Sequence, residues 1–239
     1  MTHRRIQTDD GSYTAHWVER DISYRARSGA RTEAMGVFLR SGGLLDRAGA
    51  WAVAELGFGV ATTFLLCAEE ARRHGVSLDY VSVERAPAPP EAVSGEGADA
   101  ETVRALLQAP QAGWHERVFA DGVRLRLFVG DWSRGALEHL SGSRDALFFD
   151  PFGPRIEPES WSMEAIGLAL DLLAPHGRFT TYTAASDVRR SLLAHGAHVA
   201  RVRGPAPRPE HIVAAREARL LPQENVRRYD APSPTPPPH

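Results

Sequence analysis

Residues 50–59 read AWAVAELGFG, and this stretch decides the fold. A short apolar run that ends in glycines is typical of a buried strand that enters a tight turn. Gly57 would permit the turn, and Gly59 would let a ligand approach the backbone closely. The following residues, 61–75, place apolar side chains near helical spacing and end at Gly75, which predicts a helix with a glycine stop. The sequence thus predicts a strand, a glycine turn and a helix in succession.

Further strands and helices alternate along the rest of the chain. Apolar runs predict strands at 78–85, 123–131, 145–152 and 177–183, with helices over 101–109, 161–174 and 185–196 between them. Two closing strands, 198–204 and 211–217, have no clear helix between them and suggest an antiparallel hairpin at one edge. This alternation predicts an α/β fold with a doubly wound, mostly parallel sheet of seven strands. Ligands of such sheets bind at the carboxyl ends of the strands.

Three regions divide the chain. Residues 1–45 are predicted to be a small N-terminal extension, because 13–40 contain short alternating apolar stretches that are typical of a strand or hairpin leading to a short helix. Residues 46–220 would hold the α/β domain. Residues 221–239 end in DAPSPTPPPH and are expected to be disordered or extended, because a proline-rich segment buries little apolar surface.

The composition is that of a soluble globular protein. The 239 residues carry 28 basic and 30 acidic side chains, a net charge of -2, which is not the overall charge of a nucleic-acid-binding protein. Cys67 is the single cysteine, so an internal disulfide is excluded. No apolar run is long enough to span a bilayer and the basic start has no apolar segment behind it, so we expect a cytoplasmic protein with no membrane partner. The histidines are scattered, so no metal site is expected.

Acidic side chains stand at the ends of three consecutive predicted strands. Glu55 lies two residues before the first glycine of the turn, Glu84 ends the second strand, and Asp131 ends the third strand and is followed by Trp132. In doubly wound folds, an acid in the position of Glu84 binds a ribose diol. Asp131 could accept a hydrogen bond from an adenine amino group, and Glu55 would attract a cationic group. The three acids together favour S-adenosylmethionine (SAM) as the ligand.

The glycine turn does not match a dinucleotide-binding fingerprint. That fingerprint is G-x-G-x-x-G, and here Thr62 stands where the third glycine would be. A carboxylate at Glu55 would also repel a pyrophosphate at the start of the helix. An NAD-dependent oxidoreductase is therefore a weaker alternative to a SAM-dependent protein.

The fourth predicted strand runs into Asp150-Pro151-Phe152, a short turn that is acidic, stiffened by proline and aromatic. The Asp150 carboxylate could orient an amine or accept its proton, and the Phe152 ring could face the positive charge that develops on nitrogen. Methyl transfer from an activated sulfonium needs mainly the alignment of nitrogen, methyl and sulfur. The turn therefore predicts amine methylation with Asp150 and Phe152 as catalytic residues. The structural alternative is that Asp150 only caps the turn that follows.

Five segments stand in a distinctive order along the chain. They are ELGFG at 55–59, VSVE at 81–84, VGD at 129–131, DALFFDPFGPRIEPESW at 145–161 and FTTYTAASDVRRSLLAHG at 179–196. Together with SYRARSGARTEAMGVFLRSGGL at 23–44, this order resembles the methyltransferase domain of the MnmC family, which completes 5-methylaminomethyl-2-thiouridine at tRNA wobble positions. The resemblance implies a class I, Rossmann-like fold. It also implies a SAM-dependent N-methyltransferase, present as a standalone methyltransferase domain without FAD.

The resemblance also implies a role for each matching residue. The cofactor-binding positions would be Glu55, Gly57, Phe58, Gly59, Glu84, Asp131 and Trp132, and the amine would meet Asp150 and Phe152. The candidate substrate-binding residues are Tyr24, Glu33, Pro151, Arg189, Arg190 and Arg203. One departure lies in the glycine turn, where Val60-Ala61 stands in place of the Thr-Gly that the family usually has.

Residues 188–209 favour RNA as the methyl acceptor, because arginines and no acid occur there, at Arg189, Arg190, Arg201, Arg203 and Arg208. Arginines that share a face can bind phosphates. The leading hypothesis is methylation of the aminomethyl group of a modified wobble uridine in tRNA. Two alternatives stay open at this point: a SAM-dependent methyltransferase of a small-molecule or peptide amine, and a non-catalytic SAM- or nucleotide-binding module. The sequence leaves the oligomeric state open.

Overall fold

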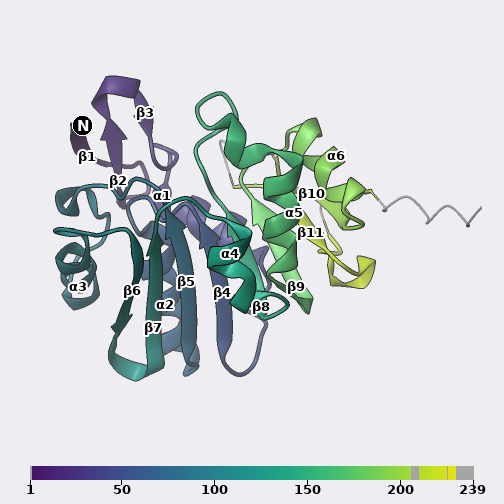
Figure 1. The fold of residues 1–239 in the computed structure, drawn as a ribbon, viewed down its shortest axis with the longest axis horizontal. Coiled ribbons are helices and arrows are strands. Elements are labelled where there is room, and N and C mark those ends of the chain that lie inside the picture. The colour runs from purple at the N-terminus through teal and green to yellow at the C-terminus, as the bar shows by residue number, and fades with distance from the viewer. Residues whose placement is uncertain (1, 206–209, 225, 230–239) are drawn as a thin grey trace, which may run out of the picture.

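The computed structural model describes residues 2–205, 210–224 and 226–229, which form two sheets flanked by helices (Figure 1). Within these residues the large sheet has nine strands in the order β12-β10-β11-β9-β8-β4-β5-β7-β6. Its central strands are parallel and comprise β4 (Trp51–Leu56), β5 (Leu78–Glu84), β7 (Val123–Val129), β8 (Arg144–Phe149) and β9 (Leu173–Thr181). The predicted doubly wound, mostly parallel α/β sheet is thus confirmed.

Antiparallel strands form both edges of the large sheet. β6 (Gly113–Val118) pairs with β7 at one edge. At the other edge, β11 (Glu210–Ala215) pairs with β9 and with β10 (His198–Arg203), and β10 also pairs with β12 (Val226–Tyr229). The predicted antiparallel edge hairpin is therefore present as β10 and β11.

The strand order reverses beside β4. β5 and β7 lie on one side of β4, whereas β8 and β9, which come later in the chain, lie on the other side. The connections that leave β4 and β8 therefore diverge to opposite faces of the sheet. A crevice between the carboxyl ends of these two strands is where doubly wound sheets bind their ligands.

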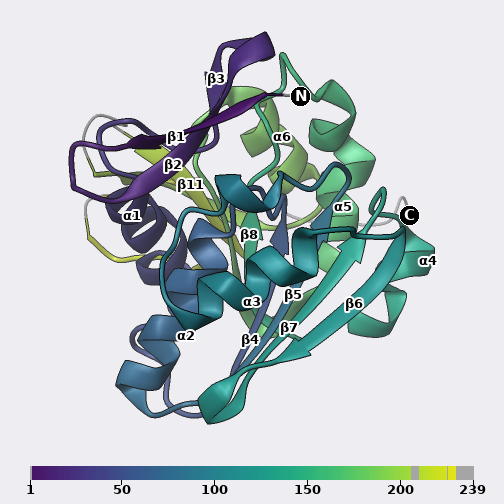
Figure 2. The ribbon, with the colours of Figure 1, turned by 90° about the vertical axis from the view of Figure 1, so that its left-hand side faces the viewer.

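Helices cover both faces of the large sheet (Figure 2). One face carries α1 (Ala30–Glu33), the π-helical segment η2 (Ala34–Arg40), α2 (Thr62–His74) and α3 (Ala98–Leu107), and the other carries α4 (Arg134–Leu137), α5 (Met163–Asp171) and α6 (Ser186–Ala194). Short 3₁₀ turns are η1 (Val18–Arg20), η3 (Pro90–Ala92), η4 (Ala120–Gly122), η5 (Glu138–Leu140), η6 (Pro158–Trp161) and η7 (Ala218–Leu220). Among the described helices, none is long and apolar enough to cross a membrane.

The first helix after β4 forms as the sequence predicts. Phe64, Cys67 and Ala71 of α2 are fully buried against the sheet, because their spacing places them on one helical face. The helix ends at His74, and the left-handed conformation of the following Gly75 lets the N–H of Val76 donate to the carbonyl of Ala71 at 2.9 Å. This packing fixes the start of α2 directly behind the glycine turn.

The N-terminal extension is a three-stranded antiparallel sheet. It consists of β1 (His3–Gln7), β2 (Tyr13–Trp17) and β3 (Ile22–Ser23) and stands above one end of the large sheet (Figures 1 and 2). Trp17 packs against Phe152 from the turn after β8, with ring centroids 6.1 Å apart. The small sheet is therefore placed over the carboxyl ends of the central strands.

The predicted count of seven strands in the large sheet is wrong, because β6 and β12 were missed. β6 is an edge strand whose side chains are mostly exposed, so its sequence, GWHERV, lacks the apolar alternation that reveals half-buried strands. β12 lies in the segment 221–239, which was predicted to be disordered or extended as a whole. The rest of that segment from residue 230 lies outside the described residues.

The boundary between α5 and β9 also differs from the prediction. The helix ends at Asp171, and the strand already begins at Leu173, so that Pro175 lies within the strand and not at the end of a longer helix. The pairing of β8 with β9 shifts between Arg144 and Ala146. A proline is tolerated at such an irregularity because no ladder hydrogen bond is needed from its nitrogen.

We expect Tyr229→Ala to lower the free energy of unfolding by about 1–2 kcal/mol, the scale for uncovering part of a large apolar side chain. Tyr229 ends β12, pairs with Val199 and packs against the core under α6. The guanidinium of Arg189 also lies over its ring at 4.5 Å. Urea unfolding of the variant measures the effect, with the exposed neighbour Arg228→Ala as control. Equal stability of the two variants would show that β12 contributes little.

Candidate functional site

Two adjoining cavities open at the carboxyl ends of the central strands. The first has a volume of about 470 Å³ and lies between the ends of β4, β5 and β7 and the start of α5. The second has a volume of about 380 Å³ and lies between the ends of β4 and β8 and the N-terminal extension. Both are lined by Gly57, Glu84, Pro151 and Glu157. One ligand can therefore extend from the first cavity towards the second.

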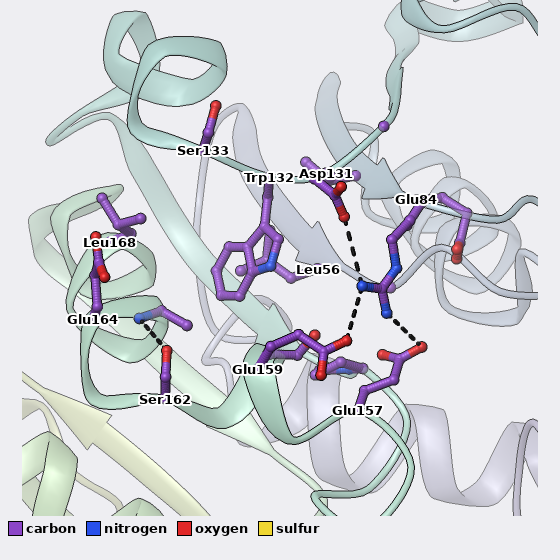
Figure 3. A pocket seen from close by; sticks show the side chains of 17 residues that line it. Leu56, Glu84, Asp131, Trp132, Ser133, Glu157, Glu159, Ser162, Glu164 and Leu168 are labelled. Carbon is purple, nitrogen blue, oxygen red and sulfur yellow. Dashed lines mark hydrogen bonds and ion pairs between the residues drawn. The ribbon is translucent and has the colours of Figure 1, made fainter.

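The first cavity (Figure 3) brings together residues predicted at two different strand ends. Glu84 is the last residue of β5, and Asp131 and Trp132 come shortly after the end of β7. Trp132 and Leu56 of β4 form an apolar wall of the cavity. The Trp132 indole packs edge-on against Phe149, with ring centroids 5.6 Å apart. An apolar wall with a few carboxylate acceptors suits a flat heterocycle that carries hydrogen-bond donors.

Two backbone donors hold the carboxylate of Glu84. The N–H of Gly59 donates to its Oε2 and the N–H of Ala86 donates to its Oε1, both at 2.9 Å. Burial raises the pKa of the Glu84 carboxyl, and these two hydrogen bonds oppose that shift. Carboxylate oxygens have further lone pairs, so Glu84 presents a fixed acceptor to both cavities.

Arg85 connects three acids that line the first cavity. Its guanidinium lies 2.9 Å from the carboxylate of Glu159, 3.4 Å from that of Glu157 and 3.6 Å from that of Asp131 (Figure 3). These ion pairs join the ends of β5 and β7 to the segment before α5. The sequence analysis assigned no role in the site to Arg85, Glu157 or Glu159. The sequence contains one indication of such a role: the two glutamates belong to the segment 145–161, which carries part of the family resemblance. Nothing comparable indicates Arg85.

The turn between β4 and α2 depends on residues with positive φ. Gly57 has a φ of +97°, and a Cβ added to it would lie 2.5 Å from the carbonyl oxygen of Asp150. A side chain at Gly57 would therefore separate the two turns that border the crevice. Ala61, which stands in place of the usual glycine, also has a positive φ of +62°. A left-handed conformation costs a residue other than glycine about 1–2 kcal/mol, so this chain keeps the turn at an energetic cost.

Aromatic rings and carboxylates form the second cavity. Nine residues that were predicted for the site line it, and four of them, Tyr24, Glu33, Asp150 and Phe152, supply two of its rings and two of its carboxylates. The rings of Tyr24 and Phe152 are tilted against each other with centroids 5.0 Å apart. Burial raises the pKa of the Tyr24 hydroxyl, and the charges of Glu84 and Glu157 raise it further. Tyr24 therefore stays neutral and can donate a hydrogen bond.

Two side-chain donors fix the turn after β8. The Tyr182 hydroxyl donates to the carbonyl of Pro151 at 3.0 Å, and the indole N–H of Trp161 donates to the carbonyl of Phe152 at 2.7 Å. Tyr182 also lines the second cavity, although the sequence analysis did not identify it. The turn thus presents Asp150 to the cavity from a firmly held backbone.

Arg25 is the main feature of the second cavity that the sequence analysis missed. Its side chain is only 5% exposed, and its Nη2 lies 2.5 Å from Oδ2 of Asp150 and 3.7 Å from Oε1 of Glu55. The same nitrogen donates to the hydroxyl of Thr63 at the start of α2. Arg25 stands beside Tyr24, which was predicted, but nothing in the local sequence indicates that its guanidinium is buried.

Two predicted cofactor-binding residues lie deeper than the others. Glu55 is fully buried and lines neither cavity, although its carboxylate faces Arg25. Phe58 is buried and packs against Phe64, and it contributes to the lining of the second cavity. Contact of either residue with a cofactor stays a prediction. Burial raises the pKa of Glu55 to about 8 despite the opposing effect of Arg25.

Glu55→Gln is expected to remove a pH-dependent loss of stability. The raised pKa, about 8 in the folded protein against 4.5 for the free side chain, means that the folded state holds this proton more tightly than the unfolded state. Stability from this group is therefore complete below pH 4.5 and falls as the pH rises to 8, with a slope of at most about 1.4 kcal/mol per pH unit. Denaturant unfolding of both proteins between pH 5 and 8 measures the difference. Parallel curves would contradict it.

The described arginines of residues 188–209 contact different groups, and their binding of substrate stays a prediction. Arg190 forms an ion pair with Asp187, and Arg201 forms one with Glu210. Both acids lie just outside residues 188–209, the segment that contains no acid. Arg189 lies over the ring of Tyr229. Arg203 instead lines an open groove with Arg40 and Arg178 on the α1 and η2 side of the sheet. Arg208 lies outside the described residues.

Comparison with known proteins agrees with this geometry. Residues 98–217 match a family of S-adenosyl-L-methionine-dependent methyltransferases. The chain is 33% identical over 223 residues to the tRNA 5-methylaminomethyl-2-thiouridine biosynthesis bifunctional protein MnmC of Chromobacterium violaceum, covering 85% of this chain and 33% of that protein. It is 32% identical over 232 residues to the protein of the same name from Cupriavidus necator, covering 90% of this chain and 34% of that one. The chain thus spans about a third of the length of these curated relatives.

The fold is shared with a solved structure. The crystal structure of MNMC2 from Aquifex aeolicus superposes with a TM-score of 0.74 at 21% sequence identity, covering 93% of this chain and 73% of that chain. This similarity places the nine-stranded sheet and its N-terminal extension in the class I methyltransferase fold, as predicted. With the match over residues 98–217 and the curated relatives, the chain belongs to the MnmC-like family of S-adenosyl-L-methionine-dependent methyltransferases.

Proposed function

We propose that this chain methylates the aminomethyl nitrogen of a modified wobble uridine in tRNA. The observation that carries the proposal is the second cavity, where carboxylates and aromatic rings meet beside the cavity suited to the cofactor. The relatives, whose names state a role in the biosynthesis of a methylaminomethyl uridine, support an amine as the acceptor.

The first cavity fits S-adenosylmethionine. Glu84 would accept from the ribose hydroxyls, because its carboxylate is fixed at the end of β5. Asp131 would accept from the adenine amino group, with the adenine against Trp132 and Leu56. The methionine end would pass the turn at Gly57 and Gly59 towards the second cavity. When bound, the cofactor supplies a methyl group that is activated on a sulfonium sulfur.

The charge of the second cavity suits a cationic amine. The acids that line it are Asp21, Glu33, Glu84, Asp150 and Glu157, whereas Arg25 is the one basic residue in the described lining. An excess of carboxylates stabilises an ammonium group and repels a phosphate or carboxylate substrate. The rings of Tyr24 and Phe152 add faces that attract a cation by about 0.5–2 kcal/mol.

Asp150 would hold the acceptor amine in line for the transfer. Its carboxylate accepts a hydrogen bond from the amine and keeps the nitrogen near the point where the cavities join. The amine must give up a proton, to Asp150 or to water, so that its lone pair can form the new carbon–nitrogen bond as the carbon–sulfur bond breaks. Phe152 faces the positive charge on nitrogen. Orientation of this kind supplies much of the acceleration in such transfers.

The charge distribution outside the cavities is consistent with an RNA acceptor. Five arginines, among them Arg40, Arg178 and Arg203, outnumber the two acids, Asp46 and Glu224, in the described lining of a groove separate from the acidic cavity. Phosphates would be attracted to the groove and repelled by the cavity, so an RNA strand would lie outside with only the modified base inserted.

Methyl transfer to tRNA tests the proposal. The chain is incubated with methyl-labelled SAM and with tRNA from cells that make the aminomethyl uridine but lack its methylation. We expect label in the wobble nucleoside after nuclease digestion, and none with tRNA that lacks the aminomethyl group. Label that instead enters a ribonuclease-resistant small molecule or peptide from a cell lysate would favour the other amine acceptors. Binding of SAM without transfer to any acceptor would favour a non-catalytic module.

A further inference from the structure

Arg25 comes from the N-terminal extension and reaches under the turn that carries Asp150. It lies two residues after the end of β3, and its backbone N–H donates to the Thr14 hydroxyl of β2 at 3.1 Å. Its guanidinium is then buried between β4, α2 and the turn after β8. The small N-terminal sheet thus delivers one charged group to the catalytic side of the large domain.

Carboxylates surround this guanidinium from three elements. Asp150 from the turn after β8 makes the closest contact, Glu55 of β4 lies further away, and Glu33 of α1 acts on it through its charge. The Phe38 ring of η2 covers the guanidinium at 4.9 Å. A guanidinium this enclosed has little freedom to move, so the Asp150 carboxylate that it contacts is held in one place.

We propose that Arg25 is a positioning residue that keeps the Asp150 carboxylate charged and fixed at the wall of the second cavity. The inference rests on the proposed role of Asp150 at the acceptor amine. A neighbouring cation favours the ionised form of a carboxylate, and without it a largely buried carboxylate near the charge of Glu33 would tend to bind a proton. A protonated Asp150 would no longer attract an ammonium group.

The location of Arg25 argues against a direct part in holding the adenosine. Arg25 lines the second cavity and not the first, where Glu84, Asp131 and Trp132 offer the contacts suited to adenosine. The guanidinium therefore acts on the reaction through Asp150. This also gives the N-terminal extension a function, because without it Asp150 would lose its counter-ion.

A double-mutant cycle tests this role. Arg25→Met should lower kcat by about 10–100-fold, the range for groups that orient a functional side chain, with SAM affinity changed by less than about threefold. Arg25→Lys should keep most of the charge and lose less activity. Because Arg25 acts through Asp150, Arg25→Met/Asp150→Asn should be no worse than Asp150→Asn alone. Arg4→Met, an exposed arginine of the same extension, serves as control and should be unaffected.

Two further readouts separate positioning from a structural role. The acidic limb of the kcat–pH profile should move to higher pH in Arg25→Met, because Asp150 then binds a proton more readily. In the free protein, the ¹³Cγ signal of Asp150, assigned by its absence in Asp150→Asn, should titrate at higher pH as well. The NMR measurement needs no acceptor, so it tests the inference even if the wild type does not methylate tRNA and the proposed function fails.

Several results would overturn the inference. Multiplicative effects in the double variant would mean that Arg25 contacts substrate or cofactor on its own. A SAM affinity at least about tenfold weaker in Arg25→Met would place Arg25 at the methionine carboxylate. An unchanged titration of Asp150 would show that the guanidinium does not control its charge. If Arg25→Met does not fold, Arg25→Lys and the double variant, which leaves no uncompensated Asp150 charge, give the same comparisons.

Discussion

Asp150→Ala is expected to lower methyl transfer by about 10²–10⁴-fold, the usual range for a positioned acid–base group, while SAM affinity stays nearly unchanged. The reason is spatial. Asp150 lines the second cavity and not the first, where Glu84 and Asp131 lie. Loss of its carboxylate should therefore affect the acceptor amine and leave the adenosine contacts in place.

Asp150→Asn distinguishes between two roles of the carboxylate. An amide keeps an acceptor oxygen but has no charge and is a far poorer base. Because Arg25 stabilises the negative charge of Asp150, the carboxylate is better suited to orient the amine than to take its proton. We therefore expect the asparagine variant to retain more activity than the alanine variant. Equal loss in both would indicate that the charge or the base function is essential.

The measurement is single-turnover methyl transfer at saturating SAM, with calorimetry for SAM affinity. Asp145→Ala provides a matched control, because Asp145 is a buried aspartate at the other end of β8, paired with Arg47 and His176. That variant should lose stability but transfer methyl groups normally when folded. Loss of SAM binding in step with turnover would assign Asp150 to the cofactor or the fold, and normal transfer in both Asp150 variants would refute its catalytic role.

The sequence predicted the parts of the fold that repeat a local pattern. β4, β5, β7, β8 and β9 are largely buried strands with either short apolar runs or alternating apolar residues, and their alternation with helices was enough to predict a doubly wound sheet. β6 was missed because most of its side chains are exposed and its residues do not alternate between apolar and polar. β12 was missed because four residues of ordinary composition precede a proline-rich end. These edge strands form because they pair with β7 and β10. Such pairing between distant segments cannot be predicted from a local sequence pattern.

The same distinction explains which site residues were found. Glu84, Asp131 and Asp150 were predicted because each ends a buried strand or lies within two residues of its end, and strand ends converge in this fold. Arg25 and Arg85 were missed because their roles depend on contacts with Asp150 and with Glu159, which lie far away in the sequence. Glu55 shows the limit of the strand-end argument. It is the last but one residue of β4, and its side chain packs inside the protein and faces Arg25 instead of a cavity.

Gly59→Val is expected to weaken SAM binding by at least about 100-fold, which corresponds to about 3 kcal/mol. Gly59 combines three properties that a valine would disturb. Its φ is +53°, a left-handed conformation that costs other residues about 1–2 kcal/mol and β-branched residues more. A Cβ would lie 3.0 Å from Cδ1 of Tyr24. Its N–H donates to Glu84, the predicted ribose acceptor.

Each of these three effects would weaken SAM binding. Relief of the left-handed strain would rotate the peptide and withdraw the N–H from Glu84, and relief of the contact would push the Tyr24 ring into the second cavity. Gly49→Val is the matched control, because Gly49 also has a positive φ, +82°, but a Cβ there meets no atom within 4 Å. Calorimetry should show SAM binding lost in Gly59→Val and kept in Gly49→Val, with both variants folded by circular dichroism. If Gly59→Val binds SAM normally, the methionine end of the cofactor does not pass this turn, and the path from the first cavity to the second must run along Pro151 and Glu157 instead.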